Sequence, residues 1–338
     1  MYIIRKLISL SLRINNWLLL LTAVGLIIFS TIVMYALEPE TFQTLFNSFW
    51  WVMTTVTTVG YGDYFPVTIA GKCYAIFLYI VGIGLIGVVI GKVVDSFSLY
   101  RSRRLKGRLK YSGNNHIILI GWNNKAKFAI EEILDSHEHT EIVIIDDLEE
   151  APIVLERVHY VRGDAANEDT MLQANLTDAK SVIIFARDSV TDASLVDGKT
   201  LLIATTVSRL APHVHTNVEI MSERNIKNFE HINVDEFILS HGMISRLAVR
   251  SAYFNGVTNI FRQLLSTSGD DLQKIRKQAR WKTYRDAFDD LLQQGATLIA
   301  DGNQLNINRK LDEVIPDTAN LYVICDEETF QKINDKSY

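Results

Sequence analysis

The sequence predicts two transmembrane helices, followed by an α/β domain of the Rossmann type and a small α+β lobe. Three observations support this fold class. Residues 1–97 are mostly apolar and hold two runs of membrane length, whereas most charged residues follow position 100. Short apolar runs then alternate with helical patterns, which is typical of a parallel, doubly wound sheet. Beyond residue 250, a helical segment, a Gly-centred turn and a further apolar run predict a separate lobe.

The first apolar run covers residues 17–37 and has no charge. At about 1.5 Å per residue it is roughly 32 Å long, enough to cross the hydrocarbon core. The second run covers residues 73–94, with Lys92 as its only charge, and belongs to a predicted inner helix over 73–97. Two buried helices of a soluble protein are the alternative, which uncharged runs of this length disfavour.

Basic side chains predict the orientation. They precede the first run and follow the second, and only Lys72 lies between the runs. The positive-inside rule therefore places both termini in the cytoplasm of a multi-pass cell-membrane protein. Residues 1–16 mix apolar and basic side chains, which predicts an interfacial N-terminal helix, with a frayed terminus as the alternative. The flanking basic residues are Arg5, Lys6, Arg13, Arg101, Arg103, Arg104, Lys106, Arg108 and Lys110.

The segment between the two runs is too short to cross the membrane again. Thr41 is a candidate N-cap for a re-entrant pore helix over 42–56. The C-terminal carbonyls of that helix would point into the membrane and favour a cation there. Non-helical backbone at this depth is tolerated only where it is buried in protein or lines water.

A six-residue motif follows the predicted pore helix. It reads TVGYGD, and its first five residues are those of potassium-channel selectivity filters, in which backbone carbonyls replace the water around the ion. Glycines permit the dihedral angles that such a loop requires. One chain supplies one loop, so a homotetramer is expected to surround bound potassium ions. The predicted filter residues are Thr58, Val59, Gly60, Tyr61 and Gly62.

Aromatic residues beside the motif are predicted to support it. Trp50, Trp51 and Tyr61 could form a cuff around the filter, although interfacial anchoring is common for Trp and Tyr. In potassium channels with the same pair of tryptophans, the first bonds to the Asp after the filter. The resemblance therefore implies that Trp50 pairs with Asp63.

The second apolar run is rich in glycine, at Gly82, Gly84, Gly87 and Gly91. Each glycine costs a helix about 1 kcal/mol relative to Ala. Close packing between helices is one reason to keep such residues. The resemblance to potassium channels implies a bend at the glycine that matches Gly82. Gly82 is therefore the predicted gating hinge. The following linker, residues 98–113, is basic and suited to anionic lipid headgroups.

Six apolar runs predict the strands of the Rossmann-type lobe, residues 114–250. A helix over 200–210 lies between two of them. The C-terminal lobe, 251–338, is predicted to hold a charged connector at 271–281, a helix at 284–293, a hairpin pairing 296–300 with 304–307, and a strand at 321–325. The six predicted strands are Asn115–Ile120, Glu141–Ile145, His159–Val161, Ser181–Phe185, Val218–Met221 and Phe237–Leu239.

The dinucleotide fingerprint in this lobe is degraded. Of the G-x-G-x-x-G pattern only Gly121 remains, and Asn123 replaces the glycine that lets backbone approach a pyrophosphate. Asp146 ends the second strand, where an acidic residue would bind ribose hydroxyls, and Asp164 ends the third. These four residues are candidates for a nucleotide site, NAD or ADP, and a polar strand end is the alternative for Asp146.

The whole pattern resembles prokaryotic two-transmembrane potassium channels with a C-terminal RCK domain, over roughly residues 12–250. The resemblance rests on TVGYGD, on IVGIG at 80–84, and on the motifs at 121–122, 162–164 and 197–200. It implies that RCK domains pair through a helical flap and form a ring, which widens on ligand binding and pulls the inner helices open.

The same resemblance implies a calcium site in one branch of the family. Its nearest matches are Asp188 and Glu219, but Met221 stands where a second Glu is expected, so the site looks incomplete. Calcium or a nucleotide is therefore the candidate gating ligand.

The sequence predicts a ligand-gated potassium channel and no enzyme. A constitutive potassium pore with the RCK domain as an assembly scaffold is the first alternative. A membrane-anchored NAD-binding oxidoreductase is the second, but no general base with a supporting constellation is evident. A net charge of −5 and a pI near 5.9 do not suggest a nucleic-acid partner. The two cysteines form no disulfide framework and fit a reducing compartment.

Overall fold

The computed structural model describes residues 16–187, 192–266 and 269–335, and the predicted N-terminal helix lies outside them. The chain divides into two compact units, Met1–Leu109 and Lys110–Tyr338. Each unit is considered by itself.

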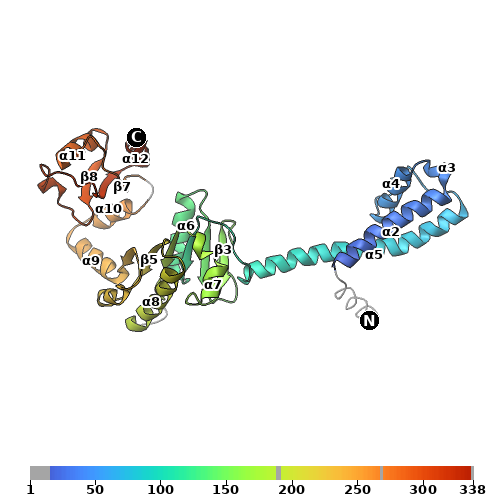
Figure 1. The fold of residues 1–338 in the computed structure, drawn as a ribbon, viewed down its shortest axis with the longest axis horizontal. Coiled ribbons are helices and arrows are strands. Elements are labelled where there is room, and N and C mark those ends of the chain that lie inside the picture. The colour runs from blue at the N-terminus through green and yellow to red at the C-terminus, as the bar shows by residue number, and fades with distance from the viewer. Residues whose placement is uncertain (1–15, 188–191, 267–268, 336–338) are drawn as a thin grey trace. The chain divides into compact units, whose positions relative to one another are not determined.

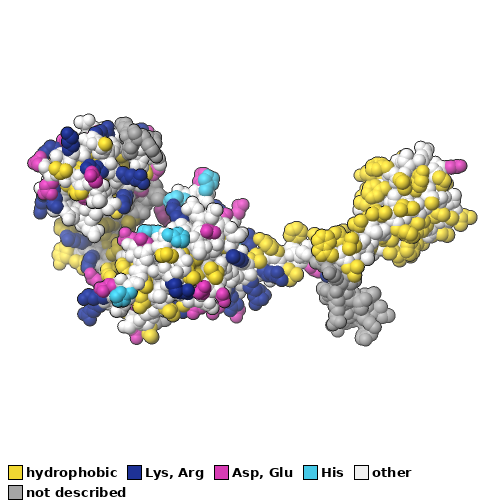
Figure 2. Space-filling view, viewed as in Figure 1, with side chains coloured by type: hydrophobic (Ala, Val, Ile, Leu, Met, Phe, Trp, Pro, Cys, Tyr) yellow, Lys and Arg dark blue, Asp and Glu magenta, His cyan; other side chains and the backbone are white. Residues whose placement is uncertain are grey.

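The first unit is helical (Figure 1). Two of its helices, α2 and α5, are long and apolar enough to cross a membrane. Only 28% and 17% of their most apolar windows is buried, unlike the core helix of a soluble protein. Figure 2 shows the surface of this unit covered with hydrophobic side chains, as a lipid solvent requires. The helices are α2 Asn16–Leu37, α3 Pro39–Phe42, α4 Leu45–Val56 and α5 Ile69–Leu105.

A small apolar core joins α2, α4 and α5. Met34, Phe42, Val52 and Leu78 are fully buried in it. Trp51 packs its ring against Phe42, with centroids 5.6 Å apart. This core holds the end of α4 in place between the two long helices.

The pore helix begins later than the sequence predicts. Thr44, and not Thr41, is the N-cap, because its Oγ1 accepts a hydrogen bond from Asn47 N over 3.2 Å. The Thr41 hydroxyl instead donates to Glu38 over 2.9 Å. Gln43 has a φ of +56°, which ends α3 and separates it from α4. The predicted helix over 42–56 is therefore wrong in its first turn.

The inner helix is longer than the predicted 73–97. It starts behind Thr68, whose Oγ1 accepts a hydrogen bond from Gly71 N, and continues without a break to Leu105. The first half of the predicted linker is thus helical, because nothing in residues 98–105 breaks a helix. Gly107, at φ +62°, lies just beyond the end of the helix, a position where glycine is favoured.

The second unit contains a six-stranded parallel sheet in the order β3-β2-β1-β4-β5-β6, which is the Rossmann order. The predicted strands are present, although β5 starts and ends earlier than expected. Its elements are β1 Ile117–Ile120, α6 Asn124–Ser136, β2 Ile142–Asp146, β3 Val158–Arg162, α7 Glu168–Gln173, η1 Leu176–Asp178, β4 Ser181–Ile184, α8 Ala193–Leu210, β5 His215–Glu219, η2 Glu223–Phe229 and β6 Glu236–Ile238.

Alternate residues of the central strand serve two cores. Ile118 and Ile120 pack in the core that includes Ile203 of α8, whereas Leu119 packs with Ile130 of α6 in the other. Both faces of the sheet are therefore covered, which explains why β1 and β2 are uninterrupted apolar runs.

The chain continues through two helices into a smaller α+β lobe with an antiparallel sheet in the order β7-β9-β8. The predicted hairpin is wrong, because β8 pairs with β9 and touches residue 304 only through a single bridge. The charged connector is wrong in part, since it contains β7. The elements are α9 Ser240–Tyr253, α10 Val257–Leu264, β7 Asp271–Ile275, α11 Tyr284–Gln293, β8 Thr297–Asp301, η3 Ile307–Arg309, β9 Leu321–Cys325 and α12 Glu327–Asp335.

Candidate functional site

The TVGYG segment leaves the C-terminal end of α4 with an alternating backbone. Thr58, Gly60 and Gly62 have φ angles of +61°, +57° and +76°, whereas φ is not positive at Val59 and Tyr61. Because the sign of φ alternates along the segment, successive N–H groups turn to one side and the carbonyls face the other. The segment therefore has the backbone pattern of a carbonyl-lined cation path.

Two hydrogen bonds hold the start of this segment on the pore helix. The N–H groups of Val59 and Gly60 donate to the carbonyl of Thr54 over 2.8 and 3.0 Å. Because these N–H groups point back to α4, the carbonyls of the same peptides point elsewhere. The side chains of Val59 and Tyr61 are exposed in the single chain, at 54% and 67%.

Trp50 contacts the filter segment at its far end. Its Nε1 donates to Asp63 Oδ2 over 2.8 Å, the contact that the resemblance implied. Its ring also stacks on Tyr61, with centroids 5.7 Å apart and planes 2° apart. Trp51 does not join this stack, because it is 4% exposed and packs in the core between the helices.

Gly82 lies where α5 approaches the end of α4. A Cβ there would lie 2.9 Å from Val56 Cγ2 and 3.3 Å from Leu78 Cδ1, so glycine allows this close contact. A Cβ at Gly84, Gly87 or Gly91 would meet nothing within 4 Å. The helix continues without a break through Gly82.

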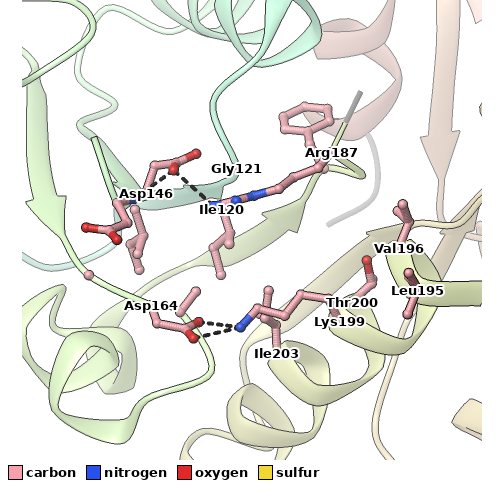
Figure 3. Close-up of a pocket in the computed structure, with 15 residues that line it drawn as sticks. Ile120, Gly121, Asp146, Asp164, Arg187, Leu195, Val196, Lys199, Thr200 and Ile203 are labelled. Carbon is pink, nitrogen blue, oxygen red and sulfur yellow. Dashed lines mark hydrogen bonds and ion pairs between the residues drawn. The ribbon is translucent and has the colours of Figure 1, made fainter. Parts of the chain in front are cut away.

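A second candidate site is a cavity of about 390 Å³ at the carboxyl ends of the parallel strands (Figure 3). It spans the ends of β1, β2, β3 and β4, and α8 forms one wall. Rossmann-type ligands bind at this edge, at the point where the strand order reverses between β1 and β4. Gly121 lines it with a φ of +89°, and a Cβ there would lie 3.0 Å from the carbonyl oxygen of Phe185.

Asp146 lies in this cavity with its carboxylate already hydrogen-bonded. Its Oδ2 accepts from Trp122 N over 2.6 Å, and its Oδ1 accepts from Asp147 N over 2.7 Å. Arg187, which follows β4, contacts Oδ1 over 3.3 Å. The sequence analysis missed Arg187, although its place just beyond an apolar strand was a usable signal.

Asp164 and Lys199 bridge another part of the cavity (Figure 3). Lys199 Nζ, from α8, lies 2.7 Å from both carboxylate oxygens of Asp164. Together with the N–H of Ala166, this ammonium holds the pKa of Asp164 below its usual range. Three of the four predicted nucleotide residues thus line one cavity.

Asn123 has a different place. Its Oδ1 accepts a hydrogen bond from Ala126 N over 2.9 Å and so caps α6, and its Nδ2 donates to Ala186 O. It does not line the cavity. In Rossmann-type folds the N–H groups at this helix N-terminus usually bind a pyrophosphate. Here one of them, the N–H of Ala126, already donates to a side chain.

Both carboxylate oxygens of Glu219 have partners inside the fold. Glu219 is 1% exposed, its Oε1 pairs with Lys125 Nζ over 2.9 Å, and its Oε2 accepts from Ala186 N over 2.8 Å. Asp188, its predicted calcium partner, lies outside the described residues. Within the described parts of the chain, no group of three or more His, Cys, Asp or Glu is arranged to hold a metal ion.

Comparisons with known proteins agree with this division of the chain. Residues 21–98 match the family described as ion channel, and residues 117–240 match the TrkA-N domain. A protein named "Putative potassium channel protein YugO", from Bacillus subtilis (strain 168), is 36% identical over 217 residues. The calcium-gated potassium channel TvoK of Thermoplasma volcanium is 32% identical over 230 residues. The chain thus combines a segment that matches the ion-channel family with a TrkA-N domain, and over these parts it is similar to potassium channels.

The alignments cover 63% and 68% of this chain, and 65% and 66% of YugO and TvoK. The chain thus spans just under two thirds of the length of these relatives. A solved structure, the GsuK channel, is similar over 95% of this chain and 59% of its own, with a TM-score of 0.51 and 13% identity. At that identity the likeness concerns the fold alone.

Proposed function

We propose that the chain forms a potassium-selective pore on the axis of a homotetramer, in a cell membrane, with both termini in the cytoplasm. The observation that carries this proposal is the TVGYG segment with positive φ at Thr58, Gly60 and Gly62. Purified channel in potassium-loaded vesicles tests it directly. With a protonophore in the membrane, we expect proton uptake driven by potassium efflux, followed with a pH-sensitive dye, and no such uptake when sodium replaces potassium inside the vesicles.

Several features support the oligomer. A ring of carbonyls needs more than one chain, and Val59 and Tyr61 are uncovered in the single chain. In the second unit, α9 and α10 have exposed large apolar side chains, which suits a flap that pairs two RCK domains. These are Met243, Ile244, Val249, Tyr253, Ile260 and Phe261.

Gating is proposed to act through α5. A ligand that widens an RCK ring would pull the linker, and α5 would then bend at Gly82. The linker enters the second unit at Tyr111, which is 8% exposed. Its N–H donates to Gln173 O over 2.9 Å, its hydroxyl donates to Glu141, and its ring packs on His116. This anchoring can transmit a displacement of the domain to the linker.

Trp50→Phe tests the support of the filter. The variant keeps a ring to stack on Tyr61 but loses the N–H that binds Asp63, a hydrogen bond to a charged group worth about 1.5–3 kcal/mol. We expect a several-fold shorter open lifetime in single-channel recordings. Trp51→Phe is the matched control, because it reduces buried area and should lower thermal stability without changing that lifetime. Equal effects of the two variants would contradict the supporting role.

The gating ligand is proposed to be a nucleotide such as ADP or NAD. The cavity at the strand ends has an acceptor for ribose hydroxyls in Asp146 and a cation for phosphate in Arg187, so its residues fit a nucleotide. Asn123 caps the N-terminus of α6, where a pyrophosphate usually binds. The phosphates are therefore proposed to bind Arg187 instead.

Arg187→Gln tests that site. Loss of a charge-assisted hydrogen bond is expected to weaken ADP or NAD binding by about tenfold or more, measured by calorimetry on the full-length channel. Arg209→Gln is the matched control, since Arg209 pairs with Glu168 at the surface and outside the cavity. Unchanged affinity in Arg187→Gln, or no binding by the wild type, would remove the nucleotide from the proposal.

Calcium is the alternative ligand, because TvoK is named as calcium-gated. Glu219 already pairs with Lys125 and accepts a hydrogen bond from Ala186 N, which disfavours calcium binding at the predicted site. Planar-bilayer recordings with calcium, ADP or NAD on the cytoplasmic face distinguish these ligands. A potassium current that ignores all three would favour the constitutive pore with a scaffolding RCK domain.

A further inference from the structure

Residues 111–116, through which the linker enters the second unit, lie against residues 173–178. Hydrogen bonds of 2.8–3.0 Å join the two stretches, and a main-chain carbonyl is the acceptor in each. A displacement of residues 173–178 would therefore displace the end of the linker. The donors and acceptors are Tyr111 N with Gln173 O, Asn175 Nδ2 with Gly113 O, Asn115 N with Asp178 O, and His116 Nε2 with Ala174 O.

Residues 164–178, here named the coupling segment, connect this contact to the cavity at the strand ends. Asp164 and Ala165 line the cavity. The carbonyl and the carboxylate of Asp164 accept hydrogen bonds from Asn167 N and Ala166 N, both over 2.9 Å, so the cavity end is joined to the start of α7. The segment thus touches the cavity at its start and the linker at its end.

The coupling segment packs tightly against the sheet. Met171, Ala174 and Leu176 are fully buried in the core that includes β1. Gly163 lines the cavity just before the segment, and a Cβ there would lie 2.5 Å from Thr170 Oγ1, so glycine allows α7 to approach the end of β3. Because a close-packed interior transmits strain, a displacement at the cavity would reach residues 173–178.

The ion pair between Asp164 and Lys199 gives the cavity end of the segment two possible arrangements (Figure 3). The side chains are 56% and 43% exposed, and a pair this exposed contributes little to stability. A nucleotide that contacts either side chain can therefore separate them. Thr206 of α8 also donates to Ala166 O over 3.1 Å, so the segment would pivot at that contact and stay attached to α8.

We propose that the coupling segment carries the effect of a bound nucleotide from the cavity to the linker, with Asn175 as the positioning residue that makes the linker follow. This inference rests on the proposed nucleotide site and on gating through the linker. Asn175 has a φ of +54°, which asparagine adopts more readily than most residues. Its Nδ2 donates to Gly113 O over 2.8 Å and to Asp178 Oδ2 over 3.0 Å, so one side chain joins linker and segment.

Asn175→Gly tests the linker end. Glycine keeps the positive φ without strain, so the variant removes the side chain alone. A hydrogen bond contributes a factor of about two to ten, so we expect the ratio of open probabilities with and without ADP or NAD to fall toward one by about that factor. Planar-bilayer recordings measure the ratio. Calorimetry on the full-length channel should show an unchanged nucleotide affinity, which a general loss of structure would not leave intact.

Lys199→Met tests the cavity end. Without the ammonium the pair with Asp164 is lost, so the open probability without nucleotide should move toward the wild-type value with nucleotide, whether that value is higher or lower. Asn233→Gly is the matched control, because Asn233 Nδ2 also donates to a carbonyl, Pro212 O over 2.7 Å, outside the cavity and the coupling segment. It should keep the wild-type response.

The outcomes separate this inference from the proposed function. A wild-type response in Asn175→Gly, at wild-type affinity, would overturn the coupling role and leave the nucleotide site intact. An unchanged open probability in Lys199→Met would do the same, and this exposed substitution decides the question if Asn175→Gly does not assemble. No binding of ADP or NAD by the wild type would overturn both the site and the coupling.

Discussion

Gly62→Ala is expected to abolish potassium-selective conduction. Gly62 has a φ of +76°, and a Cβ there would meet nothing within 4 Å in the chain, so the obstacle is the backbone angle and not a clash. An L-residue in the left-handed region costs roughly 1–2 kcal/mol, or roughly 4–8 kcal/mol over four chains. Relief of that strain rotates the peptide and removes carbonyls from the axis.

The measurement for Gly62→Ala is the permeability ratio of potassium to sodium in planar bilayers. Gly25→Ala is the matched control, because Gly25 is also in open space but lies within α2, where alanine is favoured. D-alanine at position 62 adopts positive φ and should retain selectivity. A selective channel with L-alanine at this position would refute the filter assignment.

Gly82→Ala is expected to lower open probability at least tenfold and to lower thermal stability. The stability loss follows from contact, since the new Cβ would lie 2.9 Å from Val56 Cγ2. The loss of opening follows from the proposed hinge, because alanine favours the straight helix by about 1 kcal/mol in each chain. These two effects have different causes, so a second substitution can separate them.

Val56→Ala removes both Val56 methyl groups, including the one that the new Cβ would approach most closely. In the double variant we expect thermal stability to recover toward that of Val56→Ala alone, while open probability stays low. Gly84→Ala, two residues away in open space, controls for added helix stiffness outside the contact. A double variant that opens normally would show that Gly82 serves packing only, and the hinge would be abandoned.

Much of the second unit follows from local sequence. Apolar runs such as Ile117–Ile120 and Ile142–Asp146 are buried on both faces of the sheet. These strands can therefore be located from the sequence without knowing which strands they pair with. The bounds of β5 were harder, because His215 and Asn217 interrupt its apolar character. The predicted hairpin in the small lobe is wrong because strand pairing depends on tertiary packing. β8 pairs with β9, which is more apolar than residues 304–307.

The candidate sites divide in the same way. The TVGYG motif and the Trp50–Asp63 pair lie within fourteen residues of one another, and such local patterns can be read from the chain itself. Arg187 meets Asp146, and Lys125 meets Glu219, across much longer separations. No local pattern encodes those pairs, so the sequence analysis assigned Glu219 to calcium and missed both cations.

Local sequence was enough to locate the two long apolar helices, the TVGYG motif and most of the Rossmann strands, because hydrophobic periodicity and conformationally special residues act over a few positions. The hydrogen-bond partner of each polar group, in contrast, depends on how the elements pack against one another. Thr41 binds Glu38, so it does not cap α4. Asn123 caps α6 and does not line the cavity at the strand ends. A buried donor or acceptor takes whichever partner the packed elements bring within reach, and packing depends on the whole chain.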